Sequence, residues 1–292
     1  MFEEVLERPT ALGPKKIPSR SPFRYPGGKG FFAYALAEMI AATPDIKDYA
    51  EPYAGGASAA LHLLASGSVK RIFLNDADPR IYAAWTAILH RNEEFVERLE
   101  SISINMDTWH KCLHLVLEPT AETDAFELGL ATFFLNRTNR SGIILGAGPI
   151  GGYAQAGKWK VDARFYRDTM IQRVRWLGQR SEFIHVSNLD GLTFIKRCWT
   201  GDESATTFLF IDPPYVAAGS RLYLNGMDED GHRQLGEFFQ RSTGRNWAMT
   251  YDDCPLIREI YAGMHIENLA VTYSLQHKRK AAEVLIRPPS LV

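Results

Sequence analysis

The segment best suited to chemistry is Asp212-Pro213-Pro214-Tyr215, which directly follows the apolar run 207–211. An acidic residue at the carboxyl end of a strand points into the crevice where α/β proteins bind ligands. Because proline lacks a backbone N–H, this turn offers acceptors, the Asp212 carboxylate and the Pro213 carbonyl. These acceptors, beside the flat ring of Tyr215, suit a planar base with an exocyclic NH2 group, such as adenine. The alternative is a rigid proline turn in which Asp212 only caps the strand.

A second segment, EPYAGGAS (51–58), joins a predicted strand to a predicted helix. Its glycines let the backbone approach a nucleotide-like ligand closely. Asp76 ends the next strand about 20 residues later, where an acidic side chain can hold a ribose hydroxyl. The G-x-G-x-x-G pattern is absent, so a nicotinamide-dependent enzyme is disfavoured. A glycine turn that binds nothing is the alternative.

A third segment, FRYPGGKG (23–30), precedes a predicted helix and includes Gly27, Gly28 and Lys29. Flexible glycines around a lysine at a helix start favour an anion site, which a free carboxylate would suit. The spacing of a P-loop is absent. The alternative is a solvated loop.

A fourth segment begins at FFLNRTNRSG (133–142) and opens a basic stretch. Residues 137–180 contain nine Lys or Arg against two Asp, in a chain whose net charge is −1. Such an excess with interleaved aromatic rings is typical of a nucleic-acid surface, although a solvated helix face is the alternative. The candidate DNA-binding residues are Asn136, Arg137, Asn139, Arg140, Lys158 and Lys160.

Strand and helix patterns alternate around these segments and predict a parallel α/β sheet. The stretch 94–180 has helical patterns and an irregular glycine-rich segment at 141–159, with no such alternation. We therefore expect a polar leader at 1–20, a catalytic domain formed by 21–93 and 181–292, and an inserted module at 94–180. The predicted strands are 48–53, 71–74, 183–186, 207–211 and 247–250, with a closing antiparallel pair at 266–273 and 283–286; the predicted helices are 31–42, 57–65, 81–89 and 230–240.

The composition is that of a globular protein, and it excludes several classes. No apolar stretch is long enough to span a bilayer, and the N-terminus has no secretory pattern. The three cysteines are widely spaced, as expected of reduced thiols in a cytoplasmic protein. His110 and His114 have no visible third ligand, so no metal site is expected.

Together these segments resemble the D12-class, Dam-like adenine-N6 DNA methyltransferases, in that family's order from Phe23 to Arg287. The resemblance implies a Rossmann-like sheet that binds S-adenosylmethionine, with an inserted target-recognition module. Departures are Gly55-Gly56-Ala57 where G-x-G is commoner, and Thr138-Asn139-Arg140 where the family often has Tyr-Asn-Gly. The second departure bears on the target sequence rather than on the chemistry.

By the same resemblance each segment gains an expected role. The turns at 25–29 and 53–56 would bind the cofactor, Asp76 its ribose, and the segment 212–215 the target adenine. The expected catalytic residues are Asp212, Pro213, Pro214 and Tyr215; the expected cofactor-binding residues are Tyr25, Gly27, Gly28, Lys29, Tyr53, Gly55, Gly56, Asp76 and Asp212.

The expected activity is site-specific methylation of adenine N6 in double-stranded DNA, by base flipping and direct attack. A bacterial or phage-encoded cytoplasmic enzyme is implied, with or without a restriction partner. One active site per chain needs no second copy, so a monomer is expected. Methylation of cytosine N4 or of an RNA amine, and a non-catalytic DNA-binding module, remain as alternatives.

Overall fold

The computed structural model describes residues 20–25, 28–216, 226–242, 246–272 and 280–289. All but Arg20 of the predicted leader lies outside these ranges, as do Gly27 and the last residue of the predicted strand 266–273.

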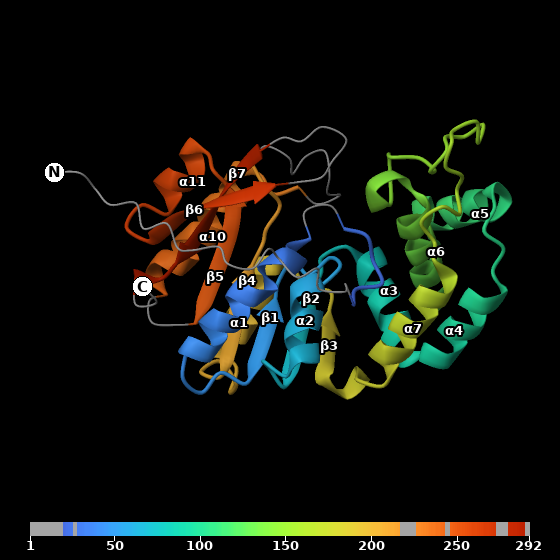
Figure 1. Cartoon of the computed structure of the whole chain (residues 1–292). Helices are drawn as coiled ribbons and strands as arrows, with labels where there is room; N and C mark the ends of the chain where they lie inside the picture. The colour runs from blue at the N-terminus through green and yellow to red at the C-terminus, as the bar shows by residue number, and fades with distance from the viewer. Residues whose placement is uncertain (1–19, 26–27, 217–225, 243–245, 273–279, 290–292) are drawn as a thin grey trace, which may run out of the picture.

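A seven-stranded sheet in the order β3-β2-β1-β4-β5-β7-β6 forms the centre of the molecule (Figure 1). Strands β1 to β5 are parallel, and β7 runs antiparallel to both of its neighbours. This arrangement confirms the predicted α/β class, with its Rossmann-like sheet and closing antiparallel pair. The strands are β1 (Asp48–Glu51), β2 (Arg71–Asn75), β3 (Ile184–Ser187), β4 (Thr207–Ile211), β5 (Trp247–Asp252), β6 (His265–Thr272) and β7 (Lys280–Arg287).

Helices cover both faces of this sheet. One face packs against α1 (Ala33–Ala42), α2 (Ser58–Ser66) and α3 (Pro79–His90), with η1 (Lys29–Phe32) leading into α1. The other face packs against α8 (Gly191–Thr200), α10 (Glu229–Arg241) and α11 (Pro255–Ile260). The central strands β1 and β4 are buried along their whole length, as expected of parallel strands covered on both faces.

Four further helices gather beyond β3, at the right of Figure 1. The chain forms α4 (Asn92–Ser101), α5 (Met106–Leu117), α6 (Ala125–Thr138) and α7 (Arg167–Gly178), with short turns η2 (Arg140–Gly142) and η3 (Ser181–Phe183). Helix α3 packs against α6, where a Cβ on Gly129 would lie 2.4 Å from the Ala83 carbonyl oxygen. The predicted insertion at 94–180 is mainly helical, with an irregular stretch at 143–166 between η2 and α7. Its exact limits stay a prediction.

The sequence explains where several helices begin. Asp78, Asn105, Asp124, Asp190 and Asp228 each accept a hydrogen bond from a backbone N–H in the first turn that follows. These caps satisfy donors that a helix start otherwise leaves unpaired. Two of the capping residues, Asp78 and Asp190, follow strands β2 and β3, so the same side chains that start helices also lie at the sheet edge.

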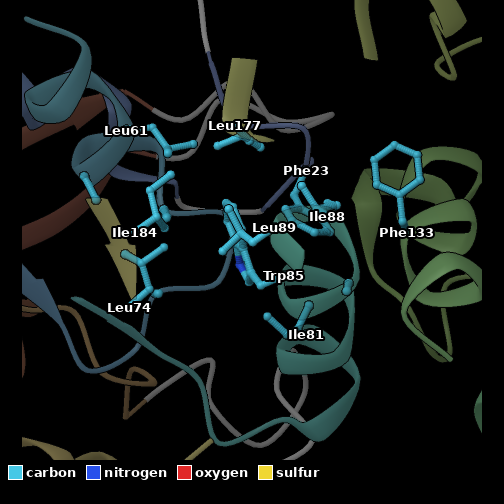
Figure 2. Close-up of a cluster of buried hydrophobic side chains, with 14 of the residues drawn as sticks. Phe23, Leu61, Leu74, Ile81, Trp85, Ile88, Leu89, Phe133, Leu177 and Ile184 are labelled. Carbon is cyan, nitrogen blue, oxygen red and sulfur yellow. The ribbon is translucent and has the colours of Figure 1, made fainter. Parts of the chain in front are cut away.

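One apolar cluster joins the sheet to the four helices beyond β3 (Figure 2). Trp85 and Leu89 of α3 lie between Leu74 and Ile184 of the sheet and Phe133 of α6. The helices therefore share a core with the sheet rather than hanging from it by a linker. No helix in the described ranges is both long and apolar enough to cross a membrane.

Candidate active site

Acidic side chains collect along the carboxyl edge of the sheet. Glu51 ends β1, Asp76 follows β2, Asp190 follows β3 and Asp212 follows β4. The strand order reverses between β1 and β4, and ligands bind at such a switch point. A cavity of about 480 Å³ opens there. Its lining includes Tyr25, Gly28, Lys29, Glu51, Tyr53, Gly56, Asp76, Asp190, Gly191, Leu192, Asp212 and Pro214.

Asp212 is held from two sides. Its Oδ1 accepts hydrogen bonds from Thr250 Oγ1 at 2.7 Å and from Tyr215 Oη at 3.2 Å. Its Oδ2 lies 2.8 Å from Lys29 Nζ. Pro213 is buried and Pro214 lines the cavity. The turn formed by residues 212–215 is called the acceptor corner below. In it, Oδ1 of Asp212 fixes the orientation of the carboxylate, and Oδ2 is the acceptor presented to a ligand.

Lys29 belongs to η1 and lies beside this acceptor corner. Only 6% of its side chain is exposed, and its ammonium also donates to Tyr215 Oη at 2.8 Å. Glu283 Oε2 on β7 lies 3.9 Å away. The sequence predicts that Lys29 serves an anionic ligand, whereas in this structure its ammonium faces carboxylates of its own chain.

The glycine turn after β1 is closely packed. Gly55 has φ +47°, and a Cβ there would lie 2.7 Å from Cε1 of Tyr25. Its N–H donates to Asp76 Oδ2 at 2.9 Å, and its carbonyl accepts from Trp85 Nε1 at 2.9 Å. The Tyr25 ring therefore lies directly on the turn, as only glycine permits. The predicted residues 25, 55 and 76 are thus brought together, although they come from three separate segments.

Asp76 is partly desolvated by the surrounding turn. Burial raises its pKa to about 6, against the opposing effect of hydrogen bonds from the backbone N–H groups of Asp78 and Gly55. Its ordinary pKa is 3.8. A carboxyl group that titrates close to neutrality at a cavity wall is typical of functional sites.

Glu51 is a site residue that the sequence patterns did not single out. Its side chain is buried, and Oε1 accepts from Tyr49 Oη at 2.9 Å and from the Ala60 N–H at 3.2 Å. Burial raises the pKa of Glu51 to about 8, so the group is protonated at neutral pH. The sequence signal that could have revealed Glu51 is its position, because it ends the strand that leads into the glycine turn.

Asp190 is a second residue that sequence reasoning missed. It caps α8 by accepting from the Thr193 N–H at 3.0 Å, and it lines the cavity with Gly191 and Leu192. A Cβ on Gly191 would lie 2.4 Å from the ring of Tyr53, so Tyr53 packs against the start of α8. A strand followed by an acid and a helix also marks Asp76, and this repeated pattern could have revealed Asp190.

The NRTN stretch needs a correction. Asn136, Arg137 and Asn139 were predicted to touch DNA, but all three are at most 3% exposed. Arg137 donates to the carbonyl oxygens of Pro22 and Arg164 instead. Their side chains satisfy buried backbone groups, and buried side chains of this kind do not reach a DNA-facing surface.

Asn136 and Asn139 act as internal clamps. The Asn136 amide exchanges two hydrogen bonds of 2.8 Å with the backbone of Arg24 and donates a third of 2.8 Å to the Gly142 carbonyl. Asn139 accepts from Trp109 Nε1 at 2.7 Å and donates to the carbonyls of residues 143 and 144. Residues 142–145 line the cavity, so these clamps join the predicted cofactor segment to the inserted helices.

The other predicted DNA-binding residues, Arg140, Lys158 and Lys160, are exposed. Tyr153, Trp159 and Tyr166 lie in the same stretch, with exposed fractions of 65%, 62% and 51%. Tyr153 also contacts the ring of Trp109, and Tyr166 accepts a hydrogen bond from Arg164. In the described part of the chain, no cluster of three or more His, Cys, Asp or Glu side chains could hold a metal ion.

The sequence profile of the D12 class N6 adenine-specific DNA methyltransferases matches residues 25–275. Two structures of the rRNA methyltransferase aviRa from Streptomyces viridochromogenes are similar to the chain, with identities of 12% and 13% and a TM-score of 0.39. Each match covers 92% of this chain and 88% of aviRa. No curated protein matches the chain.

Proposed function

Since this chain belongs to the D12 class of N6 adenine-specific DNA methyltransferases, we propose that it methylates a flipped-out adenine of duplex DNA with S-adenosylmethionine. The observation that carries the proposal is the shared cavity. The acceptor corner at Asp212 and the glycine turn at Gly55 and Gly56 lie on the same switch point of one sheet.

The residues around the cavity fit S-adenosylmethionine. A volume of about 480 Å³ falls within the range of small-molecule sites, roughly 300–1,000 Å³. Asp76 would accept from the ribose hydroxyls, and Asp190 would accept from the exocyclic amine of the cofactor's adenine. Tyr25 and Gly28 would flank the methionine part. When bound, the cofactor supplies an electrophilic methyl group on a positively charged sulfur.

Asp212 would hold the target base. Because Thr250 and Tyr215 already donate to Oδ1, Oδ2 and the Pro213 carbonyl are the acceptors available to the two hydrogens on N6. Accepting both hydrogens leaves the nitrogen lone pair to point at the methyl group. As the new N–C bond formed, the bond between the methyl group and sulfur would break and the sulfur would leave as a neutral thioether. N6 would then lose a proton, and Asp212 is the base placed to take it. Catalysis would rest on alignment and electrostatics.

The protonation and the positions of the cysteines agree with direct attack by the amine, without a covalent enzyme intermediate. Burial raises the pKa of Cys112 to about 12 and that of Cys198 to about 11, so both are protonated thiols at neutral pH. Among the described residues that line the cavity there is no cysteine. A reaction at carbon C5 of cytosine would need a thiolate nucleophile there.

The target base must leave the helix stack, at a cost of a few kcal/mol. Four exposed side chains would bind the duplex around the flipped base. They are the cations Arg140, Lys158 and Lys160 and the ring of Trp159. Sequence readout would come from the same inserted stretch, so cofactor and DNA would meet at the residues 142–145 that line the cavity.

The test compares Asp212→Ala with the surface variant Asp202→Ala on unmethylated plasmid. We expect Asp212→Ala to abolish methyl transfer while its affinity for S-adenosylmethionine stays within about tenfold. Asp202→Ala should behave as wild type. Mass spectrometry of hydrolysed product should find N6-methyladenine, and parallel reactions with RNA should stay unlabelled. N4-methylcytosine, labelled RNA or full turnover by Asp212→Ala would each contradict the proposal.

A further inference from the structure

The Lys29 ammonium occupies the place that the target amine needs. It lies 2.8 Å from Asp212 Oδ2, the acceptor proposed for N6. An ammonium at that oxygen competes with the incoming amine for the same lone pairs. It would also repel the positive charge that N6 gains as the methyl group arrives. For the proposed reaction, Lys29 must give up this contact.

Strand β7 supplies a second carboxylate for Lys29. Glu283 pairs with Asp252 in the antiparallel register of β5 and β7, and directly paired residues project to the same face. Thr250, two residues before Asp252, shares that face and bonds Asp212. Glu283 is 1% exposed, with its Oε2 at 3.9 Å from Lys29 Nζ. It lies beyond the residues 25–275 that the family profile matches.

The charges favour a transfer between the two carboxylates. The Lys29 ammonium lies 2.8 Å from Asp212 Oδ2 and 3.9 Å from Glu283 Oε2, and Glu51 adds no charge at neutral pH because its pKa is about 8. If Lys29 pairs with Glu283, Asp212 keeps both its negative charge and its acceptor oxygen. That charge would then stabilise the positive charge shared by sulfur and N6 during transfer. If Glu283 were neutral, Lys29 would hold Asp212 neutralised.

We infer that Glu283 is a positioning residue that draws Lys29 away from Asp212 when the target adenine enters. The inference rests on the proposed function. A buried ion pair can also be purely structural, and then its loss would lower stability without depending on whether Lys29 must move.

The test is a cycle of Glu283→Gln and Lys29→Met, singly and together. With Lys29 present, Glu283→Gln should lower kcat by about tenfold to a hundredfold, with little change in affinity for S-adenosylmethionine. In the Lys29→Met background there is no ammonium to move, so the same change should leave kcat nearly unaltered. Glu283→Asp should recover part of the wild-type rate. Glu267→Gln, the same change at an exposed site on β6, is the matched control.

Urea unfolding of the same four proteins without ligands gives a readout independent of turnover. Each single variant should be less stable, and the double variant should be more stable than the sum of the two losses predicts. Strictly additive losses of stability would show that Lys29 and Glu283 do not interact, and would overturn the inference. An equal fall in kcat in both backgrounds would overturn the transfer of Lys29. A wild-type chain inactive on adenine would instead refute the proposed function.

Discussion

At the scale of residues, the site depends on carboxyl groups that share one sheet edge but differ in protonation. Glu51 titrates at about 8 and Asp76 at about 6, in both cases because burial disfavours the charged form. Asp212 is held by three donors, from Thr250, Tyr215 and Lys29. One fold thus keeps a neutral acid, a titrating acid and a hydrogen-bonded acid within the wall of a single cavity.

The titration of Asp76 predicts a pH-dependent cofactor affinity. The ionised carboxylate is the better acceptor for two ribose hydroxyls, and Asp76 becomes ionised as pH rises through about 6. The Kd for S-adenosylmethionine should therefore fall by about tenfold from pH 5 to pH 7. Asp76→Asn should bind more weakly and lose this dependence. Calorimetry across that range decides, and an unchanged pH dependence in the variant would refute the role of Asp76.

Residue types revealed only part of this site. The segments at 25–29, 51–58 and 212–215 were recognisable because each combines glycine, proline or an acid with a strand or helix end. Thr250 carries no such mark, since its importance comes from its hydrogen bond to Asp212, which is distant in sequence. Glu51 lies inside a recognised segment, but its residue type alone does not indicate that it is buried and protonated. The NRTN stretch misled for a physical reason. Asparagine and arginine suit DNA, but they equally satisfy buried backbone groups, and sequence alone does not distinguish the two.

At the scale of elements, the strand β4 was predicted with its observed bounds because a threonine and four apolar residues are followed at once by a proline turn. The helices α8 and α11 were missed. Helix α11 is only six residues long, and α8 begins at Gly191, which reads as a turn. Their packing against the sheet, rather than helix propensity, stabilises them.

The glycine turn gives a prediction with a matched control. Gly55→Ala and Gly67→Ala both place an alanine at positive φ, so each should lose about 1 kcal/mol of stability. Only at Gly55 does the new Cβ meet another side chain, since nothing lies within 4 Å at Gly67. Gly55→Ala should displace Tyr25 and weaken cofactor binding by about tenfold or more. Equal cofactor affinity in both variants, by calorimetry, would show that the Tyr25 contact is irrelevant.

The internal clamp at Asn136 gives a second prediction at this scale. Asn136→Ala leaves backbone groups of Arg24 and Gly142 without their partner, which should cost about 2–3 kcal/mol of stability. Cofactor affinity should fall as well, although Asn136 is not among the residues lining the cavity. Asn105→Ala, which removes the cap of α5, should cost about 1 kcal/mol and leave that affinity unchanged. Urea unfolding and calorimetry measure both, and intact cofactor binding in Asn136→Ala would argue against the clamp.

At the scale of the whole molecule, the helices beyond β3 share one core with the sheet, and we propose that the two parts divide the tasks of binding DNA and cofactor. They share the core around Trp85, and the stretch 142–145 carries the insert to the wall of the cavity. The net charge of −1 gives no sign of the local basic excess, which lies in the stretch 137–180. The composition of the whole chain does not indicate a nucleic-acid surface, whereas the local charge predicts one.

This division predicts that DNA binding can be weakened without affecting the cofactor site. Lys158→Ala and Lys160→Ala together remove two exposed cations from the inserted stretch. If both contact phosphates, duplex affinity should fall and the slope of log K against log salt should become shallower by about 1.8, from about 0.9 per contact. Lys196→Ala on α8 is the control for an exposed lysine elsewhere. Affinity for S-adenosylmethionine should stay the same in all variants, because neither lysine lines the described cavity. Fluorescence anisotropy over a salt series measures the slope, and an unaltered slope in the double variant would place the DNA on another face.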